Sequence, residues 1–273
     1  MYKHGGYRKF IVCDNKKREI SVSSIRDRVV HKLLYNYLVE IYDKTFIYDA
    51  WSCRKGKGLH GCTKRARNFM AQNHDGHIWK ADVKKFFDNV DQKKLLEILS
   101  RRLKDETDLK IVKEIVMSYP VQGVHGRGMP IGNLSSQIFS NIYLNELDRF
   151  VKYDLKVKHY LRYGDDFVIL EKDLPVLESL RAAISDFIVK ELKLKINPKS
   201  DIIIKSGWEL KFLGMVFAER TANLSKRNKK KIYKNLNLEN AAGYYGIVKN
   251  FKEEYTQFNF VISNMLPTTK LHA

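Results

Sequence analysis

The sequence predicts an α+β fold in which an antiparallel sheet carries helices on one face. Three observations predict it. Apolar residues recur at three- and four-residue spacing over several long stretches, which is typical of helices that pack on a core. Two β-rich pieces flank a tight turn, and the elements follow one another as strand, helix, helix, hairpin, helix and strands. With 44% apolar residues among 273, the chain can bury the core of one large domain or of a few joined subdomains.

The first part of the chain is predicted to be helical. Residues 25–42 form an amphipathic helix whose start either Ser23 or Ser24 can cap. Its apolar positions are Ile25, Val29, Val30, Leu33, Leu34, Tyr37, Leu38 and Ile41. A basic, glycine-rich loop follows at residues 53–58, and a second helical stretch runs to about Gln72.

The middle of the chain is predicted to supply one strand and two helices. The strand, at residues 77–83, runs into a turn, and a helix follows at residues 93–103. A longer helix is predicted at residues 134–151, with Asn133 placed to cap its start. Its inward-facing residues are Leu134, Ile138, Ile142, Leu147 and Val151.

The next segment, residues 159–170, is predicted to be a hairpin. Two β-rich pieces, HYLRY and FVIL, are separated by residues 164–166, whose types favour a tight turn. A helix is predicted at residues 174–192, and strands at residues 201–205 and 210–217. These strands can extend the same antiparallel sheet.

The net charge points to polyanions. The chain has 50 Lys and Arg against 31 Asp and Glu, a formal charge of +19, so nucleic acid is the first partner to test. A basic protein without nucleic acid, or one that coats anionic membranes, remains an alternative. No apolar run approaches the roughly 20 residues that span a bilayer, and residues 1–7 lack the apolar core of a secretion signal. We therefore expect a cytoplasmic protein without a membrane partner.

The three cysteines agree with a reducing compartment because they are odd in number and irregularly spaced. Cys53, His60 and Cys62 suggest zinc, but no fourth ligand stands at a recognisable spacing. We interpret them as ordinary residues.

The strongest chemical signal is the adjacent pair Asp165 and Asp166 at the tip of the predicted hairpin. Two carboxylates this close repel each other unless a cation lies between them. Hard oxygen ligands of this kind suit Mg²⁺, which is bound through one or two carboxylates, phosphates and water. An ordinary solvent-exposed turn is the alternative interpretation.

A further carboxylate strengthens the metal hypothesis. Asp82 stands at the end of the strand at residues 77–83, just before the chain turns away. Phosphoryl transfer by two metals needs one ion at the attacking hydroxyl and one at the leaving group, and three carboxylates on neighbouring strands can hold both. Asp88 and Asp91 compete for this role, but they begin the following helix, where acidic residues interact favourably with the helix dipole.

Five segments in this order resemble reverse transcriptases of bacterial retroelements, over roughly residues 7–217. The segments are IRDRVVH at 25–31, KADVKKFFD at 80–88, GMPIGNLSSQ with SNIYLNELD at 128–148, YGDD at 163–166 and KFLG at 211–214. The resemblance implies a right-hand polymerase fold with fingers, an antiparallel-sheet palm and a short helical thumb. The expected division is fingers at 1–79, palm at 80–220 with an interleaved fingers segment at about 105–130, and thumb at 221–273.

The resemblance also implies an RNA-directed DNA polymerase that makes cDNA with two Mg²⁺ ions, for which Mn²⁺ can substitute. Asp82 and Asp165 would bind both ions, Asp166 would assist, and the Val83 carbonyl would add a backbone ligand. Phe87, five positions after Asp82, matches the aromatic residue that excludes a ribose 2′-hydroxyl. A core aromatic beside its neighbour is the alternative.

Basic residues in two places match segments that contact phosphates in the family. Arg54 and Lys55, with Lys57 nearby, would meet the incoming deoxynucleoside triphosphate, although a solvated basic loop would look the same. From Leu224 the chain becomes lysine-rich and then continues as short helices interrupted at glycines 243 and 246. The candidate contacts to the template RNA and the cDNA/RNA hybrid are Lys226, Arg227, Lys229, Lys230 and Lys231. A solvated basic helix is the alternative there.

One segment indicates the subclass. Many relatives have Gln before Gly132 and Pro after the later serine, where this chain has Ile131 and Gln137, and this pattern looks like that of diversity-generating retroelements. These three residues would lie at the nucleotide-binding pocket. The resemblance implies frequent errors at template adenines and a small basic accessory protein that forms a ring.

Other classes remain open. Gly164 makes the motif Tyr-Gly-Asp-Asp, which is also that of viral RNA-directed RNA polymerases, although Phe87 argues against that class. A group II intron-like or retron-type reverse transcriptase, or a catalytically silent RNA-binding polymerase relative, are the further alternatives.

Overall fold

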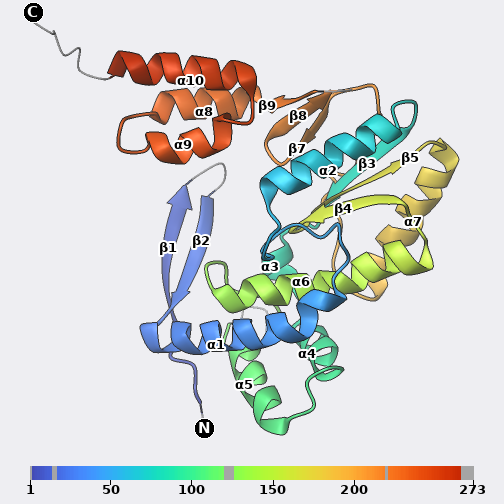
Figure 1. Ribbon diagram of the computed structural model, residues 1–273. Coiled ribbons are helices and arrows are strands. Elements are labelled where there is room, and N and C mark those ends of the chain that lie inside the picture. Colours follow the sequence, from blue (N-terminus) through green and yellow to red (C-terminus); the bar gives the residue numbers. More distant parts are fainter. Residues whose placement is uncertain (1, 14–16, 120–125, 219–220, 266–273) are drawn as a thin grey trace, which may run out of the picture. The chain divides into compact units, whose positions relative to one another are not determined.

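The structure, a computed structural model, describes residues 2–13, 17–119, 126–218 and 221–265. The chain divides into two compact units (Figure 1). The first comprises Met1–Ala66 and Gly76–Lys205, and the second comprises Arg67–Asp75 and Ser206–Ala273. Helix α2 (Leu59–Gln72) contributes its first part to one unit and its last part to the other.

The first unit is built on a four-stranded antiparallel sheet with the strand order β4-β5-β3-β6. The strands are β3 (His77–Asp82), β4 (His159–Tyr163), β5 (Asp166–Glu171) and β6 (Ile202–Lys205). A separate hairpin pairs β1 (Tyr7–Cys13) with β2 (Lys17–Ser23). The α+β prediction is therefore confirmed, and the hairpin at residues 159–170 is present as expected.

Helices pack beside this sheet in layers. α6 (Leu134–Arg149) packs against α1 (Ile25–Tyr42), α4 (Gln92–Ser100) and α7 (Leu174–Lys190), and in Figure 1 it lies between the sheet and α1. α7 packs on β3 and β5. The remaining elements of this unit are η1 (Asp43–Thr45), α3 (Phe86–Asn89), α5 (Glu106–Met117) and the π-helical turn η2 (Phe150–Asp154). The hairpin β1-β2 and α5 were not predicted.

The helix starts have local causes. Ser24 caps α1 by accepting a hydrogen bond from the Asp27 amide, and Asp91 caps α4 by accepting one from Lys94. Asn133 stands at the cap position of α6, but its side chain caps nothing. It accepts hydrogen bonds from the Ser23 amide and hydroxyl and donates to the Ser21 carbonyl at 2.6 Å, so it joins α6 to β2.

The apolar face predicted for α1 is wrong in part. Ile25, Val29 and Leu33 are exposed, whereas Asp27 and His31 are buried. The carboxylate of Asp27 accepts hydrogen bonds from the Tyr2 hydroxyl, the Gly5 amide and the Ser24 hydroxyl. Buried polar groups with partners can occupy the inner face of a helix. Hydrophobic periodicity alone therefore predicted a buried face that is displaced by about one residue from the observed one.

The second unit has a three-stranded antiparallel sheet with the order β7-β8-β9 and three helices. Its elements are β7 (Leu210–Phe212), β8 (Met215–Ala218), β9 (Thr221–Leu224), α8 (Lys226–Asn235), α9 (Ala241–Val248) and α10 (Lys252–Met265). The single strand predicted at 210–217 is a hairpin, because Leu213 and Gly214 have positive φ of 52° and 77°. The predicted interruptions at Gly243 and Gly246 are absent, since α9 runs through both.

Within the described part of the chain, no helix is both long and apolar enough to cross a membrane.

Candidate active site

The turn between β4 and β5 carries two of the three predicted aspartates. Tyr163 pairs with Asp166 across the hairpin, which leaves Gly164 and Asp165 in the turn. Gly164 has a φ of +65°, a conformation that glycine adopts at low cost. Both aspartates are half-buried, while the strand is buried from Phe167 to Leu170.

The third aspartate meets this turn through the strand register. Asp82 is the last residue of β3 and lies directly opposite Asp166, so the two side chains point to the same face of the sheet. The Val83 amide donates to the Asp165 carbonyl, with an N···O distance of 3.3 Å. The sheet therefore brings Asp82, Asp165 and Asp166 together at one end of its two inner strands, as the spacing in the sequence suggested.

The chemistry of these residues fits a hard divalent cation, because carboxylate oxygens are the ligands that Mg²⁺ prefers. Among the described residues, no group of three or more His, Cys, Asp or Glu side chains stands arranged to hold a metal ion. The fit thus rests on the donor type and on the pairing of Asp82 with Asp166.

Phe87 lies just beyond this end of the sheet. After Asp82 the chain reverses at Lys85, which has a φ of 47°. Phe86 is 2% exposed and takes the place in the core, whereas Phe87 is half-buried with its ring edge-on to that of Phe86. The Phe87 carbonyl accepts a hydrogen bond from the Met129 amide at 2.8 Å, which joins Phe87 to the segment that carries Ile131.

The segment at residues 131–137 packs against β2. The Ile131 carbonyl accepts a hydrogen bond from the Ser21 amide at 2.8 Å. Gly132 has a φ of +113°, and a Cβ there would stand 2.7 Å from Ile20, so a side chain at this position is excluded. Gln137 is exposed and Ile131 is half-buried.

The two basic residues predicted to meet a triphosphate lie in different surroundings. The side chain of Arg54 is 9% exposed, and its guanidinium donates to the Asp43 carboxylate at 2.7 Å and to the carbonyls of Asp43, Ile47 and Ala50. Lys55 is exposed. Arg54 therefore holds its own loop together.

Lys57 is also engaged within the protein. Its ammonium donates to the Tyr48 carbonyl at 2.8 Å and lies 3.4 Å from the centre of the Tyr48 ring. Burial, followed by the charge of Arg54, lowers the pKa of Lys57.

The lysine-rich stretch forms α8 in the second unit. Ser225 caps this helix by accepting a hydrogen bond from the Asn228 amide. Lys226, Arg227 and Lys230 are exposed, Lys231 is half-buried, and Lys229 forms an ion pair with the buried Glu254.

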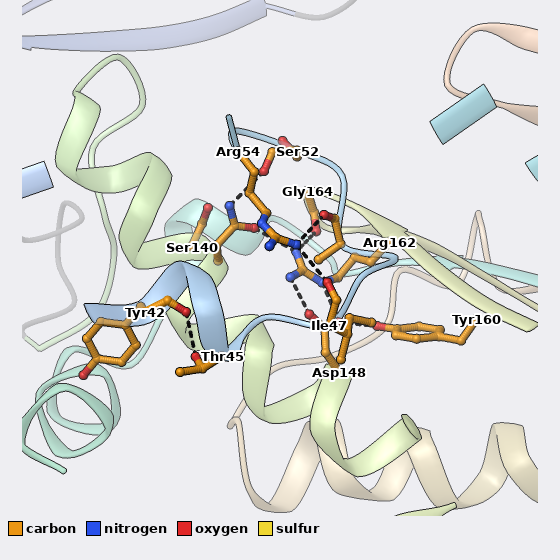
Figure 2. Close-up of polar contacts among 12 residues, drawn as sticks. Tyr42, Thr45, Ile47, Ser52, Arg54, Ser140, Asp148, Tyr160, Arg162 and Gly164 are labelled. Carbon is orange, nitrogen blue, oxygen red and sulfur yellow. Dashed lines mark hydrogen bonds and ion pairs between the residues drawn. The ribbon is translucent and has the colours of Figure 1, made fainter. Parts of the chain in front are cut away.

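Sequence reasoning missed a buried polar network behind the turn (Figure 2). The Arg162 guanidinium bonds both carboxylate oxygens of Asp148 on α6, at 2.7 and 2.6 Å, and the Tyr160 hydroxyl donates to the same carboxylate. Arg162 also donates to the Gly164 carbonyl at 2.8 Å. The available signal was an arginine beside Tyr160 and Leu161 within the predicted strand HYLRY.

An antiparallel sheet with helices beside it and with paired aspartates at the ends of its inner strands is typical of the palm of a nucleic-acid polymerase. The chain belongs to the family described as reverse transcriptase (RNA-dependent DNA polymerase), which matches residues 3–217. This family generally uses divalent metal ions.

Three relatives show how far the likeness extends. The group II intron-encoded protein LtrA of Lactococcus lactis subsp. cremoris is 22% identical over 84% of this chain and 49% of its own length. Protein YkfC of Escherichia coli is 22% identical over 67% of this chain and 58% of its own. An uncharacterized 91 kDa protein in the cob intron of Schizosaccharomyces pombe is 28% identical over 50% and 17%. The chain thus spans at most somewhat more than half of these relatives.

Two solved structures share the fold at low identity. Apo telomerase from Candida tropicalis has a TM-score of 0.59 at 12% identity, over 83% of this chain and 48% of that one. Telomerase from Candida albicans in complex with a fragment of telomeric RNA has a TM-score of 0.57 at 13% identity, over 92% and 54%. The right-hand polymerase fold expected from the sequence is therefore confirmed.

Proposed function

We propose that this chain is an RNA-directed DNA polymerase that extends a DNA strand along an RNA template. The observation that carries the proposal is the register of β3 and β5, which pairs Asp82 with Asp166 beside the turn that holds Asp165. Membership of the reverse transcriptase family supports the choice of template and product.

The three aspartates would hold two Mg²⁺ ions, with Mn²⁺ as a substitute, and the Val83 carbonyl would complete the set. Bound metal would supply a lowered pKa at the attacking 3′-hydroxyl and charge neutralisation at the leaving pyrophosphate. The residues of the chain would orient the substrates: Asp82 and Asp166 from paired strands, and Asp165 from the turn between β4 and β5.

The incoming deoxynucleotide would lie between the aspartates and the segment at 131–137. Phe87 would close the pocket beneath the sugar and exclude a ribose, a role supported by its half-buried ring next to the fully buried Phe86. Ile131, Gly132 and Gln137 would line the pocket. Lys55 is the better candidate for the triphosphate, because Arg54 would have to exchange its bonds to Asp43 for phosphate oxygens.

The nucleic-acid duplex would contact the basic helix α8 through Lys226, Arg227, Lys229, Lys230 and Lys231. Such residues neutralise phosphates without reading sequence. We assign residues 1–79 to the fingers, 80–220 to the palm with the fingers segment at about 105–130, and 221–273 to the thumb.

For the biological setting we propose a diversity-generating retroelement, with errors at template adenines and a small basic accessory protein. Ile131 supports it, because an aliphatic side chain removes a polar contact with the incoming nucleotide. A group II intron-like or retron-type enzyme is the second candidate, which the likeness to the group II intron-encoded protein favours. Accurate copying of template adenines by the purified enzyme would exclude the first setting.

Primer extension tests the central proposal. The purified chain is given an RNA template, a DNA primer, deoxynucleotides and Mg²⁺, and is compared with Asp165→Ala. We expect extension by the wild type and a loss of at least about 1,000-fold in the variant. Asp186→Ala, which removes an exposed carboxylate on α7, is the matched control and should extend normally. Equal incorporation by wild type and Asp165→Ala would leave only a silent RNA-binding relative.

A further inference from the structure

Arg162 is a buried cation directly behind the proposed metal site. Its side chain is 1% exposed and that of its partner Asp148 is 0% exposed. Burial alone would lower the pKa of Arg162, but the charge and hydrogen bonds of Asp148 raise it, so the guanidinium stays charged. A buried ion pair is seldom a better source of stability than apolar residues of equal size, because both charges lose their hydration. The pair therefore calls for a role beyond stability.

The third guanidinium nitrogen of Arg162, Nη1, indicates what that role is. Nε and Nη2 bond Asp148, while Nη1 donates to the Gly164 carbonyl at 2.8 Å. This carbonyl belongs to the peptide that precedes Asp165. The peptide that follows Asp165 is held by the Val83 amide. Both peptides flanking Asp165 are thus fixed, one of them by the buried guanidinium.

Asp148 prevents the guanidinium from turning. It accepts two parallel hydrogen bonds from Arg162 and a third, at 2.6 Å, from the Tyr160 hydroxyl. A planar fork bonded at two points has one orientation, so the direction of Nη1 is set by α6. Asp148 on α6 therefore fixes the position of the turn through Arg162 (Figure 2).

The same nitrogen also connects the turn to the segment that precedes Arg54. Nη1 lies 3.3 Å from Asn141 Oδ1, and Asn141 Nδ2 donates to the Ser52 carbonyl at 2.8 Å. The backbone of Arg162 adds two bonds, from its amide to the Asp49 carbonyl and from the Trp51 amide to its carbonyl, both at 2.9 Å. The loop that carries Lys55 and the turn that carries Asp165 therefore share one buried anchor.

We propose that Arg162, oriented by Asp148 and linked through Asn141 to Ser52, is a positioning residue that sets the place of the Asp165 carboxylate relative to the nucleotide-side loop. This rests on the proposed polymerase function. Arg162 touches neither metal nor substrate and acts through the peptide before Asp165.

The test compares two arginines that form bidentate pairs in the same unit. Arg162→Lys keeps a charge for Asp148, but a single ammonium cannot bond both carboxylate oxygens and the Gly164 carbonyl with the same geometry. We expect kcat to fall about 100-fold, because a misplaced catalytic group costs about that much, while KM for the nucleotide changes little. The Mg²⁺ concentration for half-maximal rate should rise about 10-fold, as is typical when support of a ligand is lost.

Arg181→Lys is the matched control. Arg181 bonds both oxygens of Asp201, which also accepts a hydrogen bond from Trp79, but no bond from Arg181 to the turn is present among the described residues. It should leave kcat and the Mg²⁺ requirement unchanged. Asn141→Ala, which keeps the Arg162–Asp148 pair, should shift the Mg²⁺ requirement in the same direction as Arg162→Lys but less.

The outcome is judged on folded protein, checked by the thermal midpoint and by binding of template and primer. An unchanged Mg²⁺ requirement in both Arg162→Lys and Asn141→Ala, or an equal shift in Arg181→Lys, would overturn the proposal. Binding of Mn²⁺, measured by electron paramagnetic resonance, separates the positioning hypothesis from the polymerase hypothesis. If the wild type extends no primer, the polymerase proposal fails. The positioning role would still stand if Arg162→Lys weakens Mn²⁺ binding, and would fall if it does not.

Discussion

Two arginine–aspartate pairs of the first unit have the same chemistry and different surroundings. In both, Nε and Nη2 of the arginine bond the two carboxylate oxygens, and an aromatic donor adds a third bond, from Tyr160 to Asp148 and from Trp79 to Asp201. The Arg162 side chain is 1% exposed, whereas that of Arg181 is 40% exposed. Water can replace the partner of Arg181 but not that of Arg162. The two pairs therefore differ in burial and not in hydrogen-bond geometry, and we expect burial to decide how each pair affects the protein.

Removing the aspartate of each pair should give the largest difference in the free energy of unfolding. Asp148→Ala leaves a buried guanidinium without a counter-charge, and we expect the free energy of unfolding to fall by about 3–5 kcal/mol. Asp201→Ala should cost about 1–2 kcal/mol, because its arginine can be hydrated, although the Trp79 N–H also loses its acceptor. Urea denaturation of both variants measures this. Equal losses would show that burial is not the deciding factor.

His31 is a buried group that stays neutral, in contrast to the charged Arg162, and acid should reveal it. Burial, with a smaller effect of His4, lowers the pKa of His31 from 6.5 to about 4. Between these values the unfolded chain binds a proton that the folded chain does not, so stability falls as the pH falls through this window. We expect a loss of about 2 kcal/mol between pH 7 and pH 4.5, and a smaller loss in His31→Asn.

Neighbouring groups do not change the sign of this prediction. Burial lowers the pKa of His4 as well, and His4 titrates in the same direction. Burial opposes ionisation of Asp27, but hydrogen bonds from Ser24, Tyr2 and Gly5 outweigh it and lower its pKa to about 2, below the window. Denaturation curves at several pH values measure the slope. A slope in His31→Asn as steep as that of the wild type would contradict the assignment.

The smallest effect is expected at Lys55, which is exposed, in contrast to its neighbour Arg54, whose side chain is 9% exposed. Lys55→Ala should leave stability within about 0.5 kcal/mol, as surface changes do, and raise KM for the nucleotide about 5-fold if the lysine meets the triphosphate. Arg54→Ala should instead lower stability, by about 1–3 kcal/mol, because Asp43 and two carbonyls lose their donor. Steady-state kinetics with a fixed template and primer measures the first effect. An unchanged KM in Lys55→Ala would remove it from the nucleotide site.

The sequence by itself determined the elements whose signals are local. The tight turn of Gly164 and Asp165, the strand with Asp82 at its end, and a serine cap of α1 follow from residue types within a few positions of one another, although the sequence left Ser23 and Ser24 equal as the cap. The adjacent Asp165 and Asp166 also required a special environment, because like charges repel at short range. The fold class and the aspartates of the candidate metal site could therefore be predicted.

Tertiary structure alone decided which polar side chains are buried and what they bond. Asn133 was predicted to cap α6, but it bonds Ser23, which is 110 positions away in the sequence. Arg54 is predicted to meet a nucleotide, and nothing in the sequence indicated that Asp43 and nearby carbonyls accept hydrogen bonds from its guanidinium. Arg162 carried no expectation at all. The physical reason is that periodicity reports the average polarity of a face, whereas a buried charge is stable only beside partners that the fold brings from elsewhere.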